Sequence, residues 1–269
     1  MLTVVLAVLV GLSTGFGLAC GDVLGYGWSS FFGVLAFGVV QFGSGIVLQK
    51  KVKAAMESVQ MVLVEGQKKL QAKTARWQMR PPGSIKDAQN EIARDQREFV
   101  MEALRRVETL NRFKLWVPLM GRQMATAQFQ LRWMIKDFKA VDELMPKALF
   151  MDPVSISMKM ARMYMTNVPT DSIAKVYAKG SARLKYNQNV LLAATWSWIL
   201  FKRGDVDGAF KALNAALKNS DNETLKANRD HLANNRLAHF SNAGLGDQWY
   251  ALMLEEPKIK MQRQRMQWR

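Results

Sequence analysis

The chain is poor in the residues that most often build disulfides and metal sites. Its 269 residues include one cysteine, Cys20, and two histidines, His231 and His239. A single cysteine excludes an intramolecular disulfide framework and a cysteine-rich zinc site. The histidines are eight residues apart and can share a helix face, but Asp230 is the one acidic residue directly beside them. We therefore expect surface or capping roles for both histidines and no metal site.

Signs of catalysis are also scarce. No His-Glu-x-x-His helix occurs, and the glycines before residue 50 belong to apolar runs instead of a phosphate-binding loop after a strand. We therefore expect no enzymatic activity, no catalytic residue and no cofactor.

Charge is almost missing from the first 49 residues, where Asp22 is the one charged side chain. All 38 lysines and arginines lie from Lys50 onward, and the net charge is +16. Residues 50–80 hold eight basic and two acidic residues, and residues 258–269 hold five basic residues and no acid. Positive charge concentrated in this way is typical of contact with anionic lipid or nucleic acid. For the middle of the chain, simple solubility explains the basic residues equally well.

Two uncharged runs, residues 2–20 and 23–48, are long enough to cross a membrane. A helix needs roughly 20 apolar residues to cross ~30 Å of hydrocarbon. The stretch between the runs offers a turn, and Tyr26 and Trp28 suit the membrane–water interface. We predict a transmembrane helical hairpin over residues 1–49.

Small residues at four-residue spacing occur in both runs, and such spacing lets transmembrane helices approach closely. This favours packing of the two spans against each other, or dimerisation. The two series are Ala7, Gly11 and Gly15, followed by Gly17, Gly21 and Gly25.

The orientation follows from Lys50, Lys51 and Lys53, because basic residues that flank a span stay on the cytoplasmic side. Two spans then place the N-terminus in the cytoplasm as well, and the helical domain faces the cytoplasm from the inner membrane. A cleaved signal peptide is the main alternative, but no basic segment precedes the first run. A lipoprotein site at Cys20 is disfavoured because Gly17 stands where a larger apolar residue is expected.

Residues 50–118 are expected to form a helical stalk. A heptad stripe of Met56, Leu63, Leu70 and Trp77 precedes a Pro-Pro-Gly stop. Ser84 then begins a second helix as a capping residue. The simplest arrangement is an antiparallel pair formed within the chain by 50–79 and 84–116. The alternative is a parallel coiled coil between two copies, which would make the protein a homo-oligomer.

A 34-residue period runs through residues 122–223. The step relates three aspartates, three alanines and three repeat ends. These are Asp137, Asp171 and Asp205; Ala148, Ala182 and Ala216; and Pro153, Asn187 and Asp221. With Lys147-Ala148-Leu149-Phe150-Met151-Asp152-Pro153 ending the first unit, the pattern resembles the tetratricopeptide repeat. Phe129 and Met163 depart from it, because the family has small residues at those positions. The middle unit matches least well.

The resemblance implies an all-α chain whose residues 119–257 form an α-solenoid of stacked helix pairs. Residues 224–256 would form a fourth, irregular pair that turns at Gly246 and Asp247. In this family the first helices line a concave face that binds peptides or partner proteins. The register predicts an exposed inner face of Thr126, Gln130, Trp133, Met160, Tyr164, Asn167, Ala194, Trp198 and Phe201. The alternative for Trp133, Trp198 and Phe201 is ordinary core between repeats.

The tail, residues 258–269, mixes basic residues with Met261, Met266 and Trp268. It can lie on an anionic bilayer, contact RNA, or remain a solvated end. The predicted membrane-surface contacts are Lys50, Lys51, Lys53, Lys258, Lys260, Arg263 and Arg265.

Together these features predict a membrane-anchored adaptor or scaffold that binds protein partners at the cytoplasmic face. Two other functions fit parts of the pattern. The net charge of +16 fits a membrane-tethered nucleic-acid- or ribosome-binding protein. A docking subunit of a membrane transport complex is the third possibility, although the spans lack charged residues.

Overall fold

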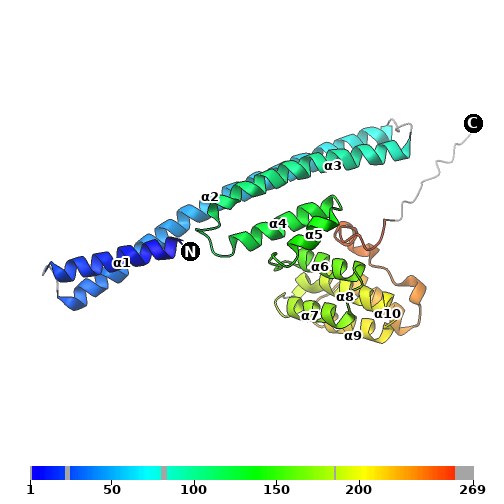
Figure 1. The fold of residues 1–269 in the computed structure, drawn as a ribbon. Coiled ribbons are helices and arrows are strands. Elements are labelled where there is room, and N and C mark those ends of the chain that lie inside the picture. The colour runs from blue at the N-terminus through cyan, green and yellow to red at the C-terminus, as the bar shows by residue number, and fades with distance from the viewer. Residues whose placement is uncertain (1, 22–24, 80–83, 185, 258–269) are drawn as a thin grey trace, which may run out of the picture. The chain divides into compact units, whose positions relative to one another are not determined.

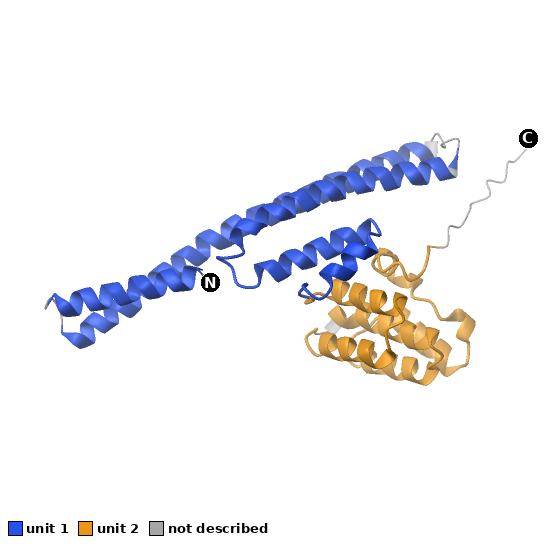
Figure 2. Ribbon diagram, in the orientation of Figure 1, with its two compact units in different colours: residues 1–149 blue, residues 150–269 orange. Residues whose placement is uncertain are grey.

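A computed structural model describes residues 2–21, 25–79, 84–184 and 186–257 (Figure 1). In these ranges every regular element is a helix and none is a strand, which confirms the all-α class. The chain divides into two compact units, Met1–Leu149 and Phe150–Arg269, shown in two colours in Figure 2. Each unit is described by itself.

The first unit begins with two long apolar helices. Helix α1 spans Leu2–Cys20, and helix α2 spans Tyr26–Met79. Both are long and apolar enough to cross a membrane, α2 through its N-terminal part. Their large side chains are mostly exposed, as at Leu9 (57%) and Phe42 (74%). Such an apolar exterior is the arrangement that a lipid environment stabilises and water does not.

Helices α1 and α2 approach closely at glycines. A Cβ built on Gly33 would lie 2.8 Å from the carbonyl oxygen of Gly11, and Ala7 is fully buried. The series Ala7, Gly11 and Gly15 therefore provides the contact that its spacing predicts. The second series does not contribute in the same way, because a Cβ on Gly17 or Gly25 would meet nothing within 4 Å.

Helix α2 continues without interruption for 54 residues, from the apolar run into the basic stalk. Helix α3, Ile85–Glu108, packs against its second half, and Ser84 caps α3 by accepting from the Asp87 N–H. The predicted pair within one chain is thus formed. It is antiparallel, because Lys73 pairs with Glu91 and Asp95 while Gly66 lies under the Phe99 ring.

The heptad stripe is only partly correct. Leu63 packs against the core between α2 and α3, and Leu70 and Trp77 are half-buried, whereas Met56 is 42% exposed. Three of the four predicted stripe residues are therefore at least half-buried, and Met56 is the exception.

Three further helices complete the first unit: η1 (Thr109–Phe113), α4 (Met120–Met134) and α5 (Phe138–Leu144). Helix α4 packs on α3, where Met120 and Met124 join the stalk core and Gln96 donates to the Met134 carbonyl at 3.2 Å. The first helix pair of the predicted solenoid therefore belongs to the same compact unit as the stalk. The units divide after residue 149, not at the predicted 118/119 boundary.

The second unit is organised around α8, Val190–Lys202, in which every residue from 191 to 200 is buried. A helix that is apolar on all sides occupies the centre of a helical array. Helices α6, α7 and α9 pack against it, and α10 packs against α9. The remaining elements are α6 (Pro153–Met165), α7 (Thr170–Ser181), η2 (Tyr186–Asn189), α9 (Val206–Leu217), α10 (Glu223–Ala233), η3 (Leu237–His239), η4 (Ala243–Leu245) and α11 (Asp247–Tyr250).

Four helices end in the same hydrogen-bonded turn. Lys136, Asn167, Gly204 and Asn235 each adopt a left-handed conformation, with φ between 54° and 84°. In each case the following N–H reaches back five residues to a carbonyl, as from Asp205 to Leu200 at 3.0 Å, and equivalent bonds close the other three turns. This is the Schellman arrangement. The first three turns are 31 and 37 residues apart, so the regular 34-residue step is an average of unequal repeats, and the fourth turn follows after 31 residues.

The middle pair accounts for the irregular spacing. Asp137 and Asp205 cap the second helices of their pairs through their carboxylates, but α7 is preceded by Pro169 and Asp171 lies inside its first turn. Ala182 is related by the 34-residue step to the buried Ala148 and Ala216 but is itself exposed. Gly180 takes that place, where a Cβ would come within 3.0 Å of the Leu192 side chain.

The predicted fourth pair is irregular, as expected, but it turns elsewhere. The turn after α10 falls at Asn235, and short helical segments follow it. Gly246, the predicted turn, instead precedes α11 with φ 61°.

Candidate partner-binding site

The inner-face residues predicted for the first pair are engaged within the first unit. The hydroxyl of Thr126 donates to the Leu149 carbonyl and accepts from the Leu149 N–H, both at 2.8 Å. Trp133 is 1% exposed and contacts the rings of Phe129 and Phe138, at centroid distances of 6.1 and 5.5 Å. Gln130 is half-buried. This pair therefore uses most of its predicted face for its own packing.

In the second unit, the chain's own C-terminal part covers the predicted face of α8. We call residues 240–255 the cover segment. Its Asn242 donates to the Ala194 carbonyl at 3.1 Å, and its Phe240 stacks on Phe201 at 4.6 Å. The indole of Trp198 meets Trp249 edge-on at 5.8 Å. All three predicted face residues of α8 thus contact this one segment.

A single carboxylate holds the two indoles. Glu255 accepts from Trp198 Nε1 at 2.7 Å through one oxygen and from Trp249 Nε1 at 2.8 Å through the other. Hydrogen bonds to a charged acceptor are stronger than neutral ones, and the two indoles are almost completely buried. Glu255 therefore joins the end of the cover segment to the centre of α8.

A buried amide pair fixes the beginning of the cover segment. Asn228 of α10 donates to the side-chain oxygen of Asn242 at 2.8 Å and accepts from the Ser241 N–H at 2.9 Å. Asn228 and Asn242 are each at most 1% exposed. Since buried amides are costly without partners, this network specifies one position for the segment.

The middle pair is linked to α8 through Tyr164 and Arg203. Tyr164 meets Trp198 edge-on at 5.1 Å, and the Arg203 guanidinium lies 5.7 Å from the Tyr164 ring. Arg203 also donates to the Val168 carbonyl and the Thr170 hydroxyl, each at 2.6 Å. The turn after α8 is thereby tied to the turn after α6.

The predicted open face must therefore be corrected at four positions, one of which is Ala194, a fully buried residue. Trp133, Met160 and Trp198 are at most 4% exposed, so the core alternative holds for both tryptophans. Phe201 and Tyr164 are half-buried, and Asn167 is an exposed turn residue. Sequence reasoning missed the cover segment because it lacks helical periodicity. The signal that it does carry is the apolar set Phe240, Trp249 and Leu252, all buried.

Two ionisable groups in the second unit are shifted by burial. Desolvation lowers the pKa of Lys159, and the nearby Lys179 ammonium lowers it further. Lys159 lies 5.0 Å above the Phe150 ring, which keeps the ammonium among apolar atoms. Burial also raises the pKa of Tyr177, against the opposite effect of its hydrogen bond with Ser181. Neither group faces a second ionisable group in an arrangement typical of acid–base catalysis.

The predicted membrane-surface residues fall into two groups. Lys50, Lys51 and Lys53 are exposed on α2 directly after the apolar run, and Lys53 makes a loose pair with Glu57 at 3.9 Å. The other group, Lys258, Lys260, Arg263 and Arg265, lies outside the described residues.

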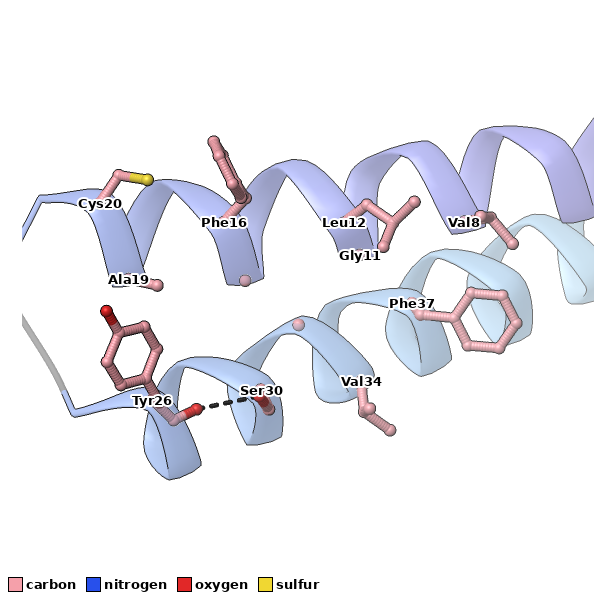
Figure 3. A pocket seen from close by; sticks show the side chains of 12 residues that line it. Val8, Gly11, Leu12, Phe16, Ala19, Cys20, Tyr26, Ser30, Val34 and Phe37 are labelled. Atoms are coloured by element: carbon pink, nitrogen blue, oxygen red, sulfur yellow. Dashed lines mark hydrogen bonds between the residues drawn. The ribbon is translucent and has the colours of Figure 1, made fainter.

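An apolar groove of about 850 Å³ runs along α1 and α2 near their connection (Figure 3). None of the described residues that line it is charged, and the Ser30 hydroxyl is already bonded to the Tyr26 carbonyl at 2.9 Å. Its other polar side-chain groups are the Tyr26 phenol and the Cys20 thiol, and the rest of the lining is apolar or glycine. Its lining residues are Val8, Gly11, Leu12, Gly15, Phe16, Ala19, Cys20, Tyr26, Ser30, Gly33, Val34 and Phe37.

Residues 11–15 spell Gly-x-Ser-x-Gly, the pattern of a nucleophile elbow, but they lie in the middle of α1. An elbow needs a sharp turn between strand and helix. Here the Ser13 hydroxyl donates back to the Leu9 carbonyl at 2.6 Å. This serine therefore has a local structural role.

Among the described residues no three histidine, cysteine or acidic side chains are grouped to hold a metal ion. The rings of His231 and His239 lie 5.4 Å apart. No protein-family model, no curated protein and no solved structure matches the chain.

Proposed function

We propose that the chain is a membrane-anchored adaptor of the tetratricopeptide-like type, which binds protein partners at the cytoplasmic face of the membrane. The anchor is the hairpin of α1 and the first half of α2. The observation that supports it best is the unbroken course of α2, from an exposed apolar surface to a basic stalk. Such a helix suits a chain that leaves hydrocarbon for an aqueous phase lined by anionic lipid.

The adaptor role rests on the helix pairs. Their first helices end in one repeated turn, and α8 holds the cover segment, which is irregular and contains aromatic residues, by hydrogen bonds and ring contacts. A face that binds 240–255 in this way has the chemistry of a peptide-binding groove. The partner class that fits is a peptide with aromatic side chains and a carboxylate, like the cover segment itself.

Photocrosslinking in intact cells tests the adaptor role. A photoreactive amino acid is placed at Asn167, in the exposed turn of the predicted face, or at the control site Lys211, exposed on the second helix α9. Adducts with one or a few proteins at Asn167 and not at Lys211 are expected. Adducts with RNA would instead support the nucleic-acid-binding function, and equal labelling at both sites would contradict a specific face.

Protease accessibility tests the orientation. With a C-terminal epitope tag, the helical domain should be digested in inverted membrane vesicles and protected in intact spheroplasts. Digestion in spheroplasts would overturn the proposed cytoplasmic face.

A further inference from the structure

Three separate parts of the first unit meet where the apolar run of α2 ends. The Leu2 N–H donates to the Leu115 carbonyl at 3.0 Å, and the Thr3 hydroxyl contacts the Trp116 carbonyl at 3.5 Å. Thr3 and Trp116 also line a hollow of about 530 Å³ together with Leu48 and Lys51 of α2. In Figure 1 the start of α1 accordingly lies beside the connection between α3 and α4. The stalk hairpin thus returns to the level at which α2 changes from apolar to basic.

The connection at this level, residues 112–119, is called the foot segment. It exposes large apolar side chains: Leu115 is 68% exposed, Leu119 55% and Trp116 36%. Singly exposed apolar residues are common. The exposed residues of the foot segment, however, adjoin the exposed apolar surface of the spans, because the backbone hydrogen bond from Leu2 to Leu115 joins the two.

The charged residues of the foot segment and of the hollow beside it are all basic. Arg112, whose guanidinium lies 4.8 Å from the Phe113 ring, and Lys114 belong to it, and Lys50 and Lys51 lie on α2 at the same level. The sequence from 109 to 136 contains no acidic residue. Glu108, exposed at the end of α3, is the nearest acid before it in the chain. A mixture of tryptophan, leucine and basic side chains is the composition that the interfacial layer of a bilayer favours.

We propose that the foot segment is a second membrane contact, in which Leu115, Trp116 and Leu119 enter the headgroup layer of the cytoplasmic leaflet. Arg112 and Lys114, with Lys50 and Lys51, bind the phosphates of anionic lipids. This inference rests on the proposed membrane anchor. It means that the stalk hairpin is held at the bilayer both where α2 leaves the apolar run and where the chain continues after α3. Helix α4 therefore starts from the membrane surface.

Spin labels measure the depth of single sites in the full chain, reconstituted in nanodiscs after Cys20→Ser removes the native thiol. One cysteine is introduced at a time: Leu115→Cys in the foot segment, Leu9→Cys on the exposed face of α1, and Gln67→Cys on the exposed face of the stalk. Accessibility to oxygen, which partitions into lipid, is compared with accessibility to a water-soluble nickel complex. Leu115 is exposed, so its replacement leaves the packing intact.

The label at 9 should be deep, the label at 67 fully aqueous, and the label at 115 shallow but inside the bilayer. An aqueous label at 115 beside a deep label at 9 would overturn the foot segment and leave the membrane anchor standing. An aqueous label at 9 would overturn the anchor itself.

The lipid class is tested in the same samples. The label at 115 should lie deeper in nanodiscs of phosphatidylcholine with phosphatidylglycerol than in phosphatidylcholine alone. The double substitution Arg112→Gln and Lys114→Gln should remove this difference. A depth that does not depend on phosphatidylglycerol would contradict the binding of anionic headgroups.

Discussion

The indole N–H of Trp198 donates to a carboxylate oxygen of Glu255 at 2.7 Å, across 57 residues of sequence. Trp198 lies at the centre of α8, and Glu255 ends the cover segment. This bond places the chain's own C-terminal part on the face that a repeat protein would offer to a partner. The inner face of α8 is therefore already a binding surface, with an occupant supplied by the same chain.

Removing the carboxylate should loosen the cover segment. Glu255→Ala leaves two almost buried indole N–H groups without their acceptor, and each lost partner of this kind costs about 1–3 kcal/mol. We expect the unfolding free energy to fall by at least about 2 kcal/mol, measured by urea titration of the full chain in detergent micelles. Glu256→Ala is the matched control, because that side chain is exposed. Equal stability of the two variants would show that Glu255 does not hold the segment.

Two left-handed turn residues should change the stability of the protein in opposite directions when glycine is introduced at one and removed at the other. Lys136 has φ 58° and Gly204 has φ 84° in equivalent turns. The left-handed conformation costs a residue with a Cβ about 1 kcal/mol relative to glycine. Lys136→Gly should therefore stabilise the protein and Gly204→Ala should destabilise it, each by roughly 1 kcal/mol in thermal unfolding. Lys139→Gly, inside α5, should instead be destabilising, because glycine lowers helix stability.

The contact between α1 and α2 should depend on Gly33. A side chain there meets backbone atoms, the Gly11 carbonyl oxygen at 2.8 Å and the Gly15 Cα at 3.2 Å. Because backbone cannot move aside cheaply, Gly33→Ile should force the helices apart at a cost of about 1–3 kcal/mol. Gly38→Ile is the control, since a Cβ there meets nothing within 4 Å.

The glycine variants are compared by SDS titration. Fluorescence transfer between labels on Val4→Cys and Val47→Cys, in a Cys20→Ser background, reports separation of the helices. A Gly33→Ile hairpin that opens at the same SDS fraction as Gly38→Ile would contradict the close contact.

The stalk should weaken at alkaline pH. Hydrogen bonds to Asp95 and then to Glu91 raise the pKa of Lys73 above its ordinary value of 10.5. The pKa of Lys73 is therefore higher in the folded state than in the unfolded state, so its ion pairs stabilise the fold fully at any pH below the unfolded pKa. This stabilisation is lost as the pH rises through the folded pKa. The stability difference between the native chain and Lys73→Met should therefore be constant at neutral pH and shrink above pH 10.5. A difference that persists there would show that the lysine contributes through packing alone.

Lys159 should be a destabilising charge. Its pKa is lowered, so at neutral pH the folded state carries an ammonium that burial and Lys179 disfavour. Lys159→Met keeps the contact with the Phe150 ring and removes the charge, so the melting temperature should rise. The control Lys175→Met changes an exposed lysine on α7 and should have little effect. A lower melting temperature for Lys159→Met would contradict this reading.

Much of the architecture could be predicted from local patterns. The charge-free runs predict α1 and the first half of α2 because length and hydropathy are properties of consecutive residues. The Pro-Pro-Gly stop and the Ser84 cap likewise predict where α3 begins. The 34-residue step locates the first helices of three pairs, although Asp171 and Ala182 show that it does not set every turn.

The use of each face was decided only by the tertiary structure. The register assigns Trp198 and Phe201 to one side of α8, but no periodic signal tells whether a partner, a neighbouring helix or a distant segment covers that side. The cover segment lies more than 35 residues away and is largely without regular periodicity, so its place depends on single contacts such as Asn242 to Ala194 and Glu255 to Trp198. The bond between Leu2 and Leu115 is of the same kind. Sequence by itself determined which segments are helical and apolar, because those properties are local. Tertiary structure decided which surfaces stay open, because that depends on contacts between residues that are far apart in the chain.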